Sequence, residues 1–504
     1  MNRNIVLLLF SLTHLLATAG LEVASPFSDN AVLQQGRPVP IWGRAEAGAK
    51  VSVEFGEQKV SVVANAGGSW RVELKPLPAD ATPRTLTVRA SGESFACENV
   101  VVGEVWLASG QSNMQWTLQN CAKHLTEVRD AMNHSESLEI RYLRIGAQAE
   151  SQPVKTFDRT RYRWCMDSSK TRPAQSAVAF FFAHRLHREL KVPVGIIDTS
   201  WGGKPIEGFI PREQFESHEA LKPILELADS NRLEELKKIE GGVFIRNDAG
   251  HPGRIFNGRL APLAPYSVRG TIWYQGESNA GIDEDPRGYR HKMAALATGW
   301  RQAFEDARMP FYFVQLPPFR SEWIAWARLR EEQRRSLVIP HTGMAVTIDL
   351  RSADIHPPNK IDVAERLARW SLAKTYQTTE AIPSGPIFKS ADFEGKQVRV
   401  HFDYVGAGLM VARKEGLKAP VVTPDAPLEH FELRGEDGVW HPAQAAIDDS
   451  RVLLTSKSVN RPTAVRYACE GAPANANLYN RAGLPASPFS SDPDSVPWVN
   501  VKPN

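Results

Sequence analysis

Cysteine is scarce in this chain of 504 residues, and no two cysteines are close in sequence: Cys97, Cys121, Cys165 and Cys469. A zinc knuckle takes its cysteines in close pairs, so this spacing argues against one. Four cysteines also exclude a disulfide-dense scaffold. The spacing leaves two alternatives open, namely one disulfide or four free thiols.

An excess of charge of one sign is also lacking. The 60 Lys and Arg residues nearly balance the 57 Asp and Glu residues, which leaves a net charge of +3. This balance argues against nucleic acid as a partner and against a polybasic membrane-binding surface. The content of 42% hydrophobic and 23% charged residues is normal for a folded, soluble protein and excludes global disorder.

Long hydrophobic runs are absent beyond the first residues, since no later run approaches about 20 apolar residues. Near the start, Arg3 precedes a largely apolar stretch, 5–16, and Ala17-Thr18-Ala19 follows it. This pattern predicts a cleavable signal peptide at 1–19, and hence a secreted or periplasmic protein without membrane contact after cleavage. The alternatives are a buried N-terminal strand and an uncleaved anchor.

Motifs for metal or phosphate binding are missing too. The chain has no His-Glu-x-x-His, no Cys-x-x-Cys and no Gly-x4-Gly-Lys-Ser/Thr loop. We therefore expect neither a metal nor a cofactor.

What is present is a change of pattern along the chain. Residues 20–100 contain short alternating runs separated by Gly, Pro and Asn turns, which predicts an N-terminal β-sandwich-like domain. These runs are 39–42, 50–55, 58–63, 70–74 and 84–89. Residues 382–504 are again β-like and rich in Pro and Gly, with runs at 398–402, 431–434, 452–455 and 464–468. We expect a C-terminal β-rich module there.

Between these regions, residues 101–381 alternate apolar strands with amphipathic helices. The strands are expected at 100–108, 194–197, 270–274, 311–316 and 344–348, and the helices at 177–190, 291–307, 323–336 and 360–375. Repetition of strand and helix is typical of an α/β fold with a doubly wound parallel sheet. A charged segment near 211–250 predicts a helical insertion over one face.

Polar motifs follow four of the expected strands. The first, Gly-Gln-Ser-Asn-Met at 110–114, places Ser112 where a strand meets a helix N-terminus. Reactive groups gather at such strand ends in α/β sheets, and the N–H of the serine can face a developing oxyanion. The alternative role for Ser112 is an ordinary helix N-cap.

The second and third motifs offer hydrogen-bond donors. Residues 198–203 read Asp-Thr-Ser-Trp-Gly-Gly, and the paired Gly202 and Gly203 allow a backbone N–H to approach a ligand closely. Residues 273–279 read Trp-Tyr-Gln-Gly-Glu-Ser-Asn, in which a side-chain amide can donate to an oxyanion. Taken alone, the second motif is also compatible with a plain tight turn, and the third with an ordinary polar strand end.

The fourth motif is Asp354-Ile355-His356-Pro357, after the last strand of the α/β region. A histidine has an ordinary pKa near 6.5, which suits a general base at neutral pH. A neighbouring carboxylate can hold the imidazole in one tautomer. Four strand ends thus supply a nucleophile, oxyanion donors and a base.

Together the four motifs resemble the SGNH hydrolase superfamily and, within it, the sialate O-acetylesterase family. Flanking segments are similar as well, at 26–34, 256–258 and 471–479, so the resemblance covers nearly the whole chain after the expected signal peptide. It implies an SGNH-type three-layer α/β/α catalytic domain with a parallel sheet, flanked by β-rich modules. It also implies a secreted serine esterase that removes O-acetyl groups from carbohydrates through an acetyl-enzyme intermediate, without a cofactor.

The resemblance implies a role for each matching residue. Ser112 attacks the acetyl carbonyl and His356 transfers the proton, with Asp354 as the acid of the triad. The oxyanion hole is implied at Ser112, Gly202, Gly203 and Gln275. Contacts to the acetylated sugar or glycan are implied for Asn113, Asn257, Glu277 and Asn279.

Two of these assignments depart from the superfamily pattern. The usual Asp stands three residues before the His, where this chain has Ala353, so Asp349 and a Ser–His dyad are the alternatives to Asp354. The third motif usually supplies Asn rather than Gln, so Asn279 competes with Gln275.

Two other functions compete with the esterase. Glu277 and Asp354 are candidates for the paired carboxylates of a secreted glycosidase. The chain is alternatively a non-catalytic glycan-binding protein. Among acetylated substrates, sialic acids and plant or algal polysaccharides remain open.

Overall fold

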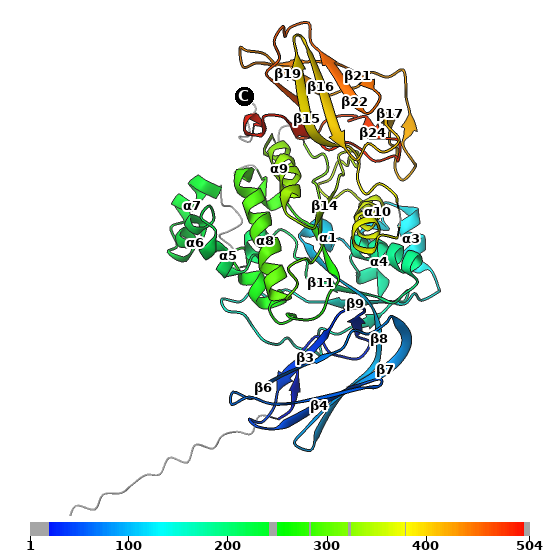
Figure 1. Ribbon diagram of the computed structural model, residues 1–504, viewed down its shortest axis with the longest axis vertical. Coiled ribbons are helices and arrows are strands. Elements are labelled where there is room, and N and C mark those ends of the chain that lie inside the picture. Colours follow the sequence, from blue (N-terminus) through cyan, green and yellow to red (C-terminus); the bar gives the residue numbers. More distant parts are fainter. Residues whose placement is uncertain (1–19, 241–248, 282–283, 321–323, 379, 498–504) are drawn as a thin grey trace, which may run out of the picture.

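The computed structural model describes residues 20–240, 249–281, 284–320, 324–378 and 380–497. Its strands and helices form three regions in chain order, with β-rich regions at the two ends of the molecule and an α/β region between them (Figure 1). Buried apolar residues from all three regions belong to one continuous core.

The N-terminal region consists of two small groups of strands. The first is an antiparallel sheet of β1 (Glu22–Val23), β3 (Val39–Arg44) and β6 (Ser69–Leu74). The second contains β2 (Val32–Gln34), β4 (Lys50–Phe55), β5 (Gln58–Val63) and β7 (Asp80–Ala90), and it joins β8 (Glu93–Gly110). Alternate residues of β6 are buried and exposed, as expected for a sheet with one face on a core.

Strand β8 is 18 residues long and connects this region to the central sheet. Its first half pairs antiparallel with β7, whereas Glu104–Ala108 pair parallel with β11 (Val194–Asp198). On the other side, 106–110 pair parallel with β12 (Gly270–Tyr274). One strand therefore belongs to both regions.

The central sheet has the spatial order β10-β9-β11-β8-β12-β13-β14. Besides the strands given above, it contains β9 (Ile140–Arg144), β10 (Cys165–Met166), β13 (Phe311–Val314) and β14 (Thr342–Ala345), of which only β10 runs antiparallel among these described neighbours. Strand order reverses beside β8, and ligands of open α/β sheets bind at the carboxyl ends of strands near such a point.

Helices pack on both faces of this sheet. On one face, Trp106 of β8 contacts Phe182 of α4 (Ala177–Leu190), and Tyr312 of β13 stacks on Trp370 of α10 (Lys360–Trp370). On the other face, Trp273 of β12 meets Trp300 of α8 (Tyr289–Ala303). The remaining helices are α1 (Ser112–Gln115), α2 (Leu118–Cys121), α3 (Thr126–Asn133), α5 (Arg212–Ser217), α6 (Lys222–Asp229), α7 (Leu233–Glu240) and α9 (Ile324–Arg335).

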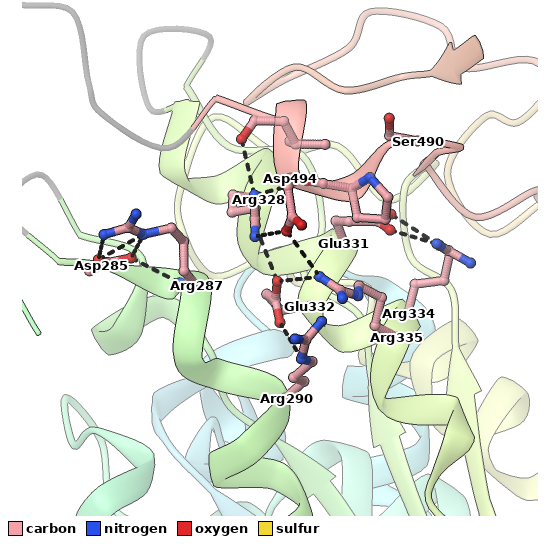
Figure 2. A network of polar contacts seen from close by, with 12 residues as sticks. Asp285, Arg287, Arg290, Arg328, Glu331, Glu332, Arg334, Arg335, Ser490 and Asp494 are labelled. Atoms are coloured by element: carbon pink, nitrogen blue, oxygen red, sulfur yellow. Dashed lines mark hydrogen bonds and ion pairs between the residues drawn. The ribbon is translucent and has the colours of Figure 1, made fainter. Parts of the chain in front are cut away.

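The C-terminal region is built of three small sheets. In spatial order they are β15 (Ile387–Glu394), β16 (Gln397–Asp403), β22 (Arg451–Thr455) and β21 (Gln444–Asp448); then β18 (Val421–Val422), β17 (Leu409–Arg413) and β24 (Leu478–Asn480); and β20 (Trp440–Pro442), β19 (Phe431–Arg434), β23 (Ala464–Tyr467) and β25 (Phe489–Ser490). Side chains of α9 connect this region to the central one (Figure 2). Arg328 of α9 bonds both Glu332 of the same helix and Asp494 of the C-terminal segment.

The expected mixed α/β fold with β-rich regions at both ends is confirmed. Strand β9 was not predicted, and the helix expected at 360–375 ends as an α-helix at Trp370 and continues as a π-helix, Ser371–Tyr376. The helical segment near 211–250 contains α5 to α7, and part of it lies outside the described residues. The four cysteines are free thiols.

The expected signal peptide, 1–19, also lies outside the described residues. Within the described ranges, no helix has the length and apolar character needed to cross a bilayer. The domain boundaries remain predictions.

Candidate active site

Ser112 is the first residue of α1, directly beyond the end of β8. The turn between them needs glycine at position 110, because its φ is +135° and an added Cβ would lie 2.0 Å from the carbonyl oxygen of Tyr274. Neither the hydroxyl nor the N–H of Ser112 forms a hydrogen bond with another described residue. Ser112 is partly exposed, so its hydroxyl is available for chemistry at the carboxyl edge of the sheet.

The second motif lies beside Ser112. A Cβ added to Gly202 would be 3.4 Å from the Ser112 Cβ, and its N–H donates to Gln115 Oε1 at 3.0 Å. Gly203 has a φ of +66° and open space on its Cβ side. The buried Arg259 secures this loop from behind by donating to the carbonyl of Ser200 at 2.6 Å and packing 4.4 Å from the Trp201 ring centre.

Side chains of the third motif are turned inward. Gln275 donates to Gln111 Oε1 at 3.0 Å and to Asn279 Oδ1 at 2.7 Å, so protein oxygens already accept from its amide nitrogen. Asn279 donates to both carboxylate oxygens of Glu207 at 3.0 Å. Glu207 in turn forms a buried ion pair with Lys292 at 2.5 Å. This network braces the loop that follows β12.

Two further residues with expected sugar contacts are also tied to the protein. Asn257, in a π-helix (Phe256–Leu260), donates to the carbonyl of Glu150 at 3.1 Å. Glu277, in a 3-10 helix (Glu277–Asn279), accepts a hydrogen bond from Asn113. Burial raises the pKa of Glu277 above its ordinary value.

His356 and Asp354 form a hydrogen-bonded pair after β14. His356 Nδ1 lies 2.9 Å from Asp354 Oδ1, and the His356 N–H donates to the same oxygen at 2.7 Å. That N–H is the main cause of a lowered pKa for Asp354. Burial lowers the pKa of His356, while the hydrogen bond to Asp354 opposes this shift. Burial of the imidazole thus favours its neutral form, which a general base requires.

Asp349, the alternative acid, has other partners. Its two carboxylate oxygens accept from Arg366 at 2.6 and 2.7 Å, and the Tyr479 hydroxyl lies 3.3 Å away. Both Asp349 and Arg366 have nearly buried side chains. Asp349 therefore connects the segment after β14 to α10 and to β24 of the C-terminal region.

The fold brings the Ser112 turn and the His356 segment together through two contacts. The ring of His356 stacks on Trp116, which follows α1, with 4.8 Å between ring centres and 17° between planes. Asn113 donates to the carbonyl of Ile355 at 3.0 Å. Residues 242 positions apart in sequence are thus adjacent, and the nucleophile and base candidates lie on contacting segments.

Sequence reasoning missed two residues of this arrangement. Gln115 binds the Gly202 N–H, and nothing in the sequence distinguishes it from a solvent-facing glutamine. Lys360 is fully buried and donates to Asn113 Oδ1. A signal for Lys360 exists, because it shares the apolar face of α10 with Val363 and Leu367 at the i, i+3 and i+7 spacing. Within the described ranges, no three His, Cys, Asp or Glu side chains gather as metal ligands would.

Comparison with known proteins identifies the family. Residues 257–373 match the family model described as carbohydrate esterase, sialic acid-specific acetylesterase. The sialate O-acetylesterase of Rattus norvegicus is 26% identical over 94% of this chain and 95% of its own, and that of Homo sapiens is 26% identical over 74% of each.

Among solved structures, a carbohydrate acetylesterase from Xanthomonas citri superposes with a TM-score of 0.80. It is 33% identical and the match covers 94% of this chain and 99% of that one. A likeness of this extent, over all three regions, shows common descent rather than a shared fold alone. This chain is therefore a carboxylic ester hydrolase that belongs to the sialate O-acetylesterase family of carbohydrate esterases.

Proposed function

We propose that this esterase removes acetyl groups from O-acetylated carbohydrates, with Ser112 as nucleophile, His356 as general base and Asp354 as the residue that orients the histidine. The observation that carries the proposal is the Asp354–His356 pair, whose imidazole stacks on the turn that begins with Ser112. Because Nδ1 faces the carboxylate, it carries the proton, and Nε2 is left as the proton acceptor.

The reaction then has two halves. Ser112 Oγ attacks the acetyl carbonyl while His356 takes its proton, and the histidine returns that proton to the departing sugar hydroxyl. The resulting acetyl-enzyme is hydrolysed when His356 activates a water in the same way. Acetate leaves and the serine is regenerated.

The oxyanion formed in each half needs hydrogen-bond donors, and removal of one typically costs about 10²–10³ in rate. We propose the N–H groups of Ser112 and of Gly202 or Gly203, with Gln275 as a third donor. In the resting structure the Gly202 N–H is bound to Gln115, and Gln275 is bound to Gln111 and Asn279. Either group must exchange one of these partners to serve.

The sugar contacts also stay a proposal. Asn113, Asn257, Glu277 and Asn279 are each between 0% and 5% exposed and hydrogen-bonded inside the protein. In this structure their side chains are bound to protein partners, so a sugar contact requires one of these bonds to be exchanged. The names of the relatives, sialate O-acetylesterase and carbohydrate acetylesterase, support O-acetyl sialic acids or other acetylated carbohydrates as the substrate class.

For the whole chain we propose export after removal of 1–19 and an SGNH-type three-layer catalytic domain at 101–381. The β modules at 20–100 and 382–504 flank it. Helices on both faces of a parallel sheet, with Ser112 at a strand end next to the reversal of strand order, support this assignment.

The test is acetate release from 4-nitrophenyl acetate and from a panel of acetylated sialosides and polysaccharides. We expect Ser112→Ala to lower kcat by at least about 10³, since the attacking group is lost. The control is Ser94→Ala, at an exposed serine of β8 far from the turn, which we expect to match the wild type. Full activity of Ser112→Ala would contradict the mechanism. Glycan cleavage without acetate release would instead favour the paired carboxylates of a glycosidase.

A further inference from the structure

Lys360 is a charged residue in an apolar position. It begins α10 with a fully buried side chain, and its ammonium lies 5.2 Å from the ring centre of Tyr274 and 5.7 Å from that of Trp116. Within the described part of the chain, no carboxylate forms an ion pair with it. Burial of an ammonium group costs free energy unless polar partners compensate, so the hydrogen bond to Asn113 and the two ring faces must do so.

Asn113 joins this ammonium to the base segment. Its Oδ1 accepts from Lys360, and its Nδ2 donates to Glu277 and to the carbonyl of Ile355. An ammonium has no acceptor, so Lys360 fixes which way the amide points. With Oδ1 directed at Lys360, only Nδ2 can face Ile355. The orientation that holds the Ile355 carbonyl is therefore set by Lys360 on the oxygen side of the amide, together with Glu277 on the nitrogen side.

The same ammonium supports His356 from a second side. The Trp116 ring contacts Lys360 and also stacks on the imidazole. Asn113 is adjacent in sequence to Ser112, and Ile355 is adjacent to His356. Lys360 thus contacts both groups that hold the nucleophile turn and the base segment together.

We propose that Lys360 is a positioning residue of this esterase: it aligns His356 with Ser112 through Asn113 and Trp116, and its positive charge keeps the imidazole in the neutral, proton-accepting form. The inference rests on the roles proposed above for Ser112 and His356.

Electrostatics supports this role. Burial lowers the pKa of Lys360 to about 8, so the group is still mostly charged at pH 7. After burial itself, the charge of Lys360 is a further cause that lowers the pKa of His356, and Asp354 acts in the opposite direction. His124 packs on Trp116 as well, at 6.2 Å between ring centres. Asp354 and Lys360 are the charged groups that act on the imidazole from its own segment and from α10.

The experiment compares Lys360→Met with wild type and with Lys374→Met, a matched change at an exposed lysine in the π-helix that continues α10. Values of kcat and kcat/KM for 4-nitrophenyl acetate are measured from pH 5 to pH 9. We expect kcat of Lys360→Met to fall at least tenfold. The acid limb of its pH–rate profile, which reports protonation of His356, should move to higher pH, because the lost charge no longer disfavours the imidazolium. The pH–rate profile of Lys374→Met should coincide with that of the wild type.

A kcat within twofold of wild type, or a loss of activity with an unmoved acid limb, would overturn the proposal. If Lys360→Met shows no cooperative thermal transition, Lys360→Gln replaces it. Lys360→Gln removes the positive charge but keeps a hydrogen-bond donor. The acid limb of its pH–rate profile should move to higher pH as in Lys360→Met.

A second readout does not depend on catalysis. Carbethoxylation of the peptide that contains His356, followed against pH by mass spectrometry, reports the fraction of neutral imidazole directly. The pH midpoint of this modification should rise in Lys360→Met and stay unchanged in Lys374→Met. If Ser112→Ala keeps full activity, the proposed function fails, yet this titration still decides whether Lys360 acts on His356.

Discussion

Two aspartates near His356 differ in what surrounds them. The Asp354 side chain is 65% exposed and its carboxylate bonds to His356, whereas Asp349 is 3% exposed and is held by Arg366 and Tyr479. A carboxylate that orients a histidine matters in the transition state, while one that neutralises a buried arginine matters for folding. The two residues should therefore affect different measurements.

We predict that Asp354→Asn lowers kcat at least about tenfold, since general-base catalysis is worth about 10²–10⁴ and depends on the correct tautomer. The acid limb should also move to lower pH, because Asp354 raises the pKa of His356. Asp349→Asn should lower the melting temperature, since a broken buried ion pair typically costs about 3–5 kcal/mol.

To check both expectations, kcat is measured between pH 5 and pH 9 and thermal unfolding is followed for each variant. Equal, small losses of kcat in both variants would favour the Ser–His dyad. A large loss of kcat in folded Asp349→Asn alone would exchange the two roles.

At the residue scale, the sequence identifies the proposed reactive groups because they lie in polar motifs that follow expected strands, and it misses the residues that hold those groups in place. Ser112 begins the helix that follows β8, and His356 lies in the segment between β14 and α10. The supports depend on tertiary contacts between distant segments, such as Gln115 with Gly202 and Lys360 with Asn113. No local pattern reveals which glutamine or lysine will meet them.

At the element scale, α9 joins the α/β region to the C-terminal segment through a cluster of arginines and carboxylates (Figure 2). The buried Glu332 lies 3.1 Å from Arg328 and 3.2 Å from Arg335, and Arg328 also donates to the carbonyl of Pro493 at 2.8 Å. Burial nevertheless raises the pKa of Glu332 to about 7, since it outweighs the arginines that favour the charged form.

This shift predicts a pH-dependent stability. The folded pKa of Glu332 exceeds its ordinary value of 4.5, so its contribution to stability is fully present below about pH 4.5 and is lost as pH rises through about 7. Glu332→Gln has no proton to lose. We therefore expect the melting temperature of Glu332→Gln, relative to wild type, to increase from pH 5 to pH 8.

The control is Glu46→Gln, the same substitution at an exposed position of the N-terminal region. Calorimetry or circular dichroism at several pH values measures both differences. A Glu332→Gln difference that is constant or falls with pH would contradict the expected direction.

Elements whose apolar residues recur at the strand or helix period could be predicted, even where charged residues occupy the positions between them. The helix at 177–190 and the strands at 50–55, 58–63 and 270–274 have the expected bounds. Strand β9 escaped prediction because arginines interrupt its apolar run. Arg141 is nevertheless buried, and its guanidinium bonds the carbonyl of Asn99.

At the scale of the whole molecule, the three regions share a core and several polar contacts. Gln315, which follows β13, donates to Ser487 Oγ at 2.9 Å, and the Phe319 N–H donates to the carbonyl of Gly471 at 3.1 Å. At the other end, β8 runs through both the N-terminal strands and the central sheet. No region can lose its structure without exposing the core of its neighbour.

We therefore predict one cooperative thermal transition for the full chain, since separate transitions require cores that unfold independently. Calorimetry should give one peak, and near-ultraviolet and far-ultraviolet circular dichroism should give the same midpoint. Addition of an inhibitor that acylates Ser112 should shift the whole peak. Two resolved peaks, of which only one responds to the inhibitor, would show that the regions unfold separately.

The shared strand β8 also has a consequence for biosynthesis. Its first half finds β7 already made, but 104–110 pair with β11 and β12, which leave the ribosome only after about 90 to 160 further residues. At about 5–20 residues per second, this segment waits for roughly 5 to 30 seconds with both hydrogen-bonding edges open. We therefore expect the nascent chain to expose an unpaired strand just before the proposed nucleophile, which is a segment that a chaperone can protect.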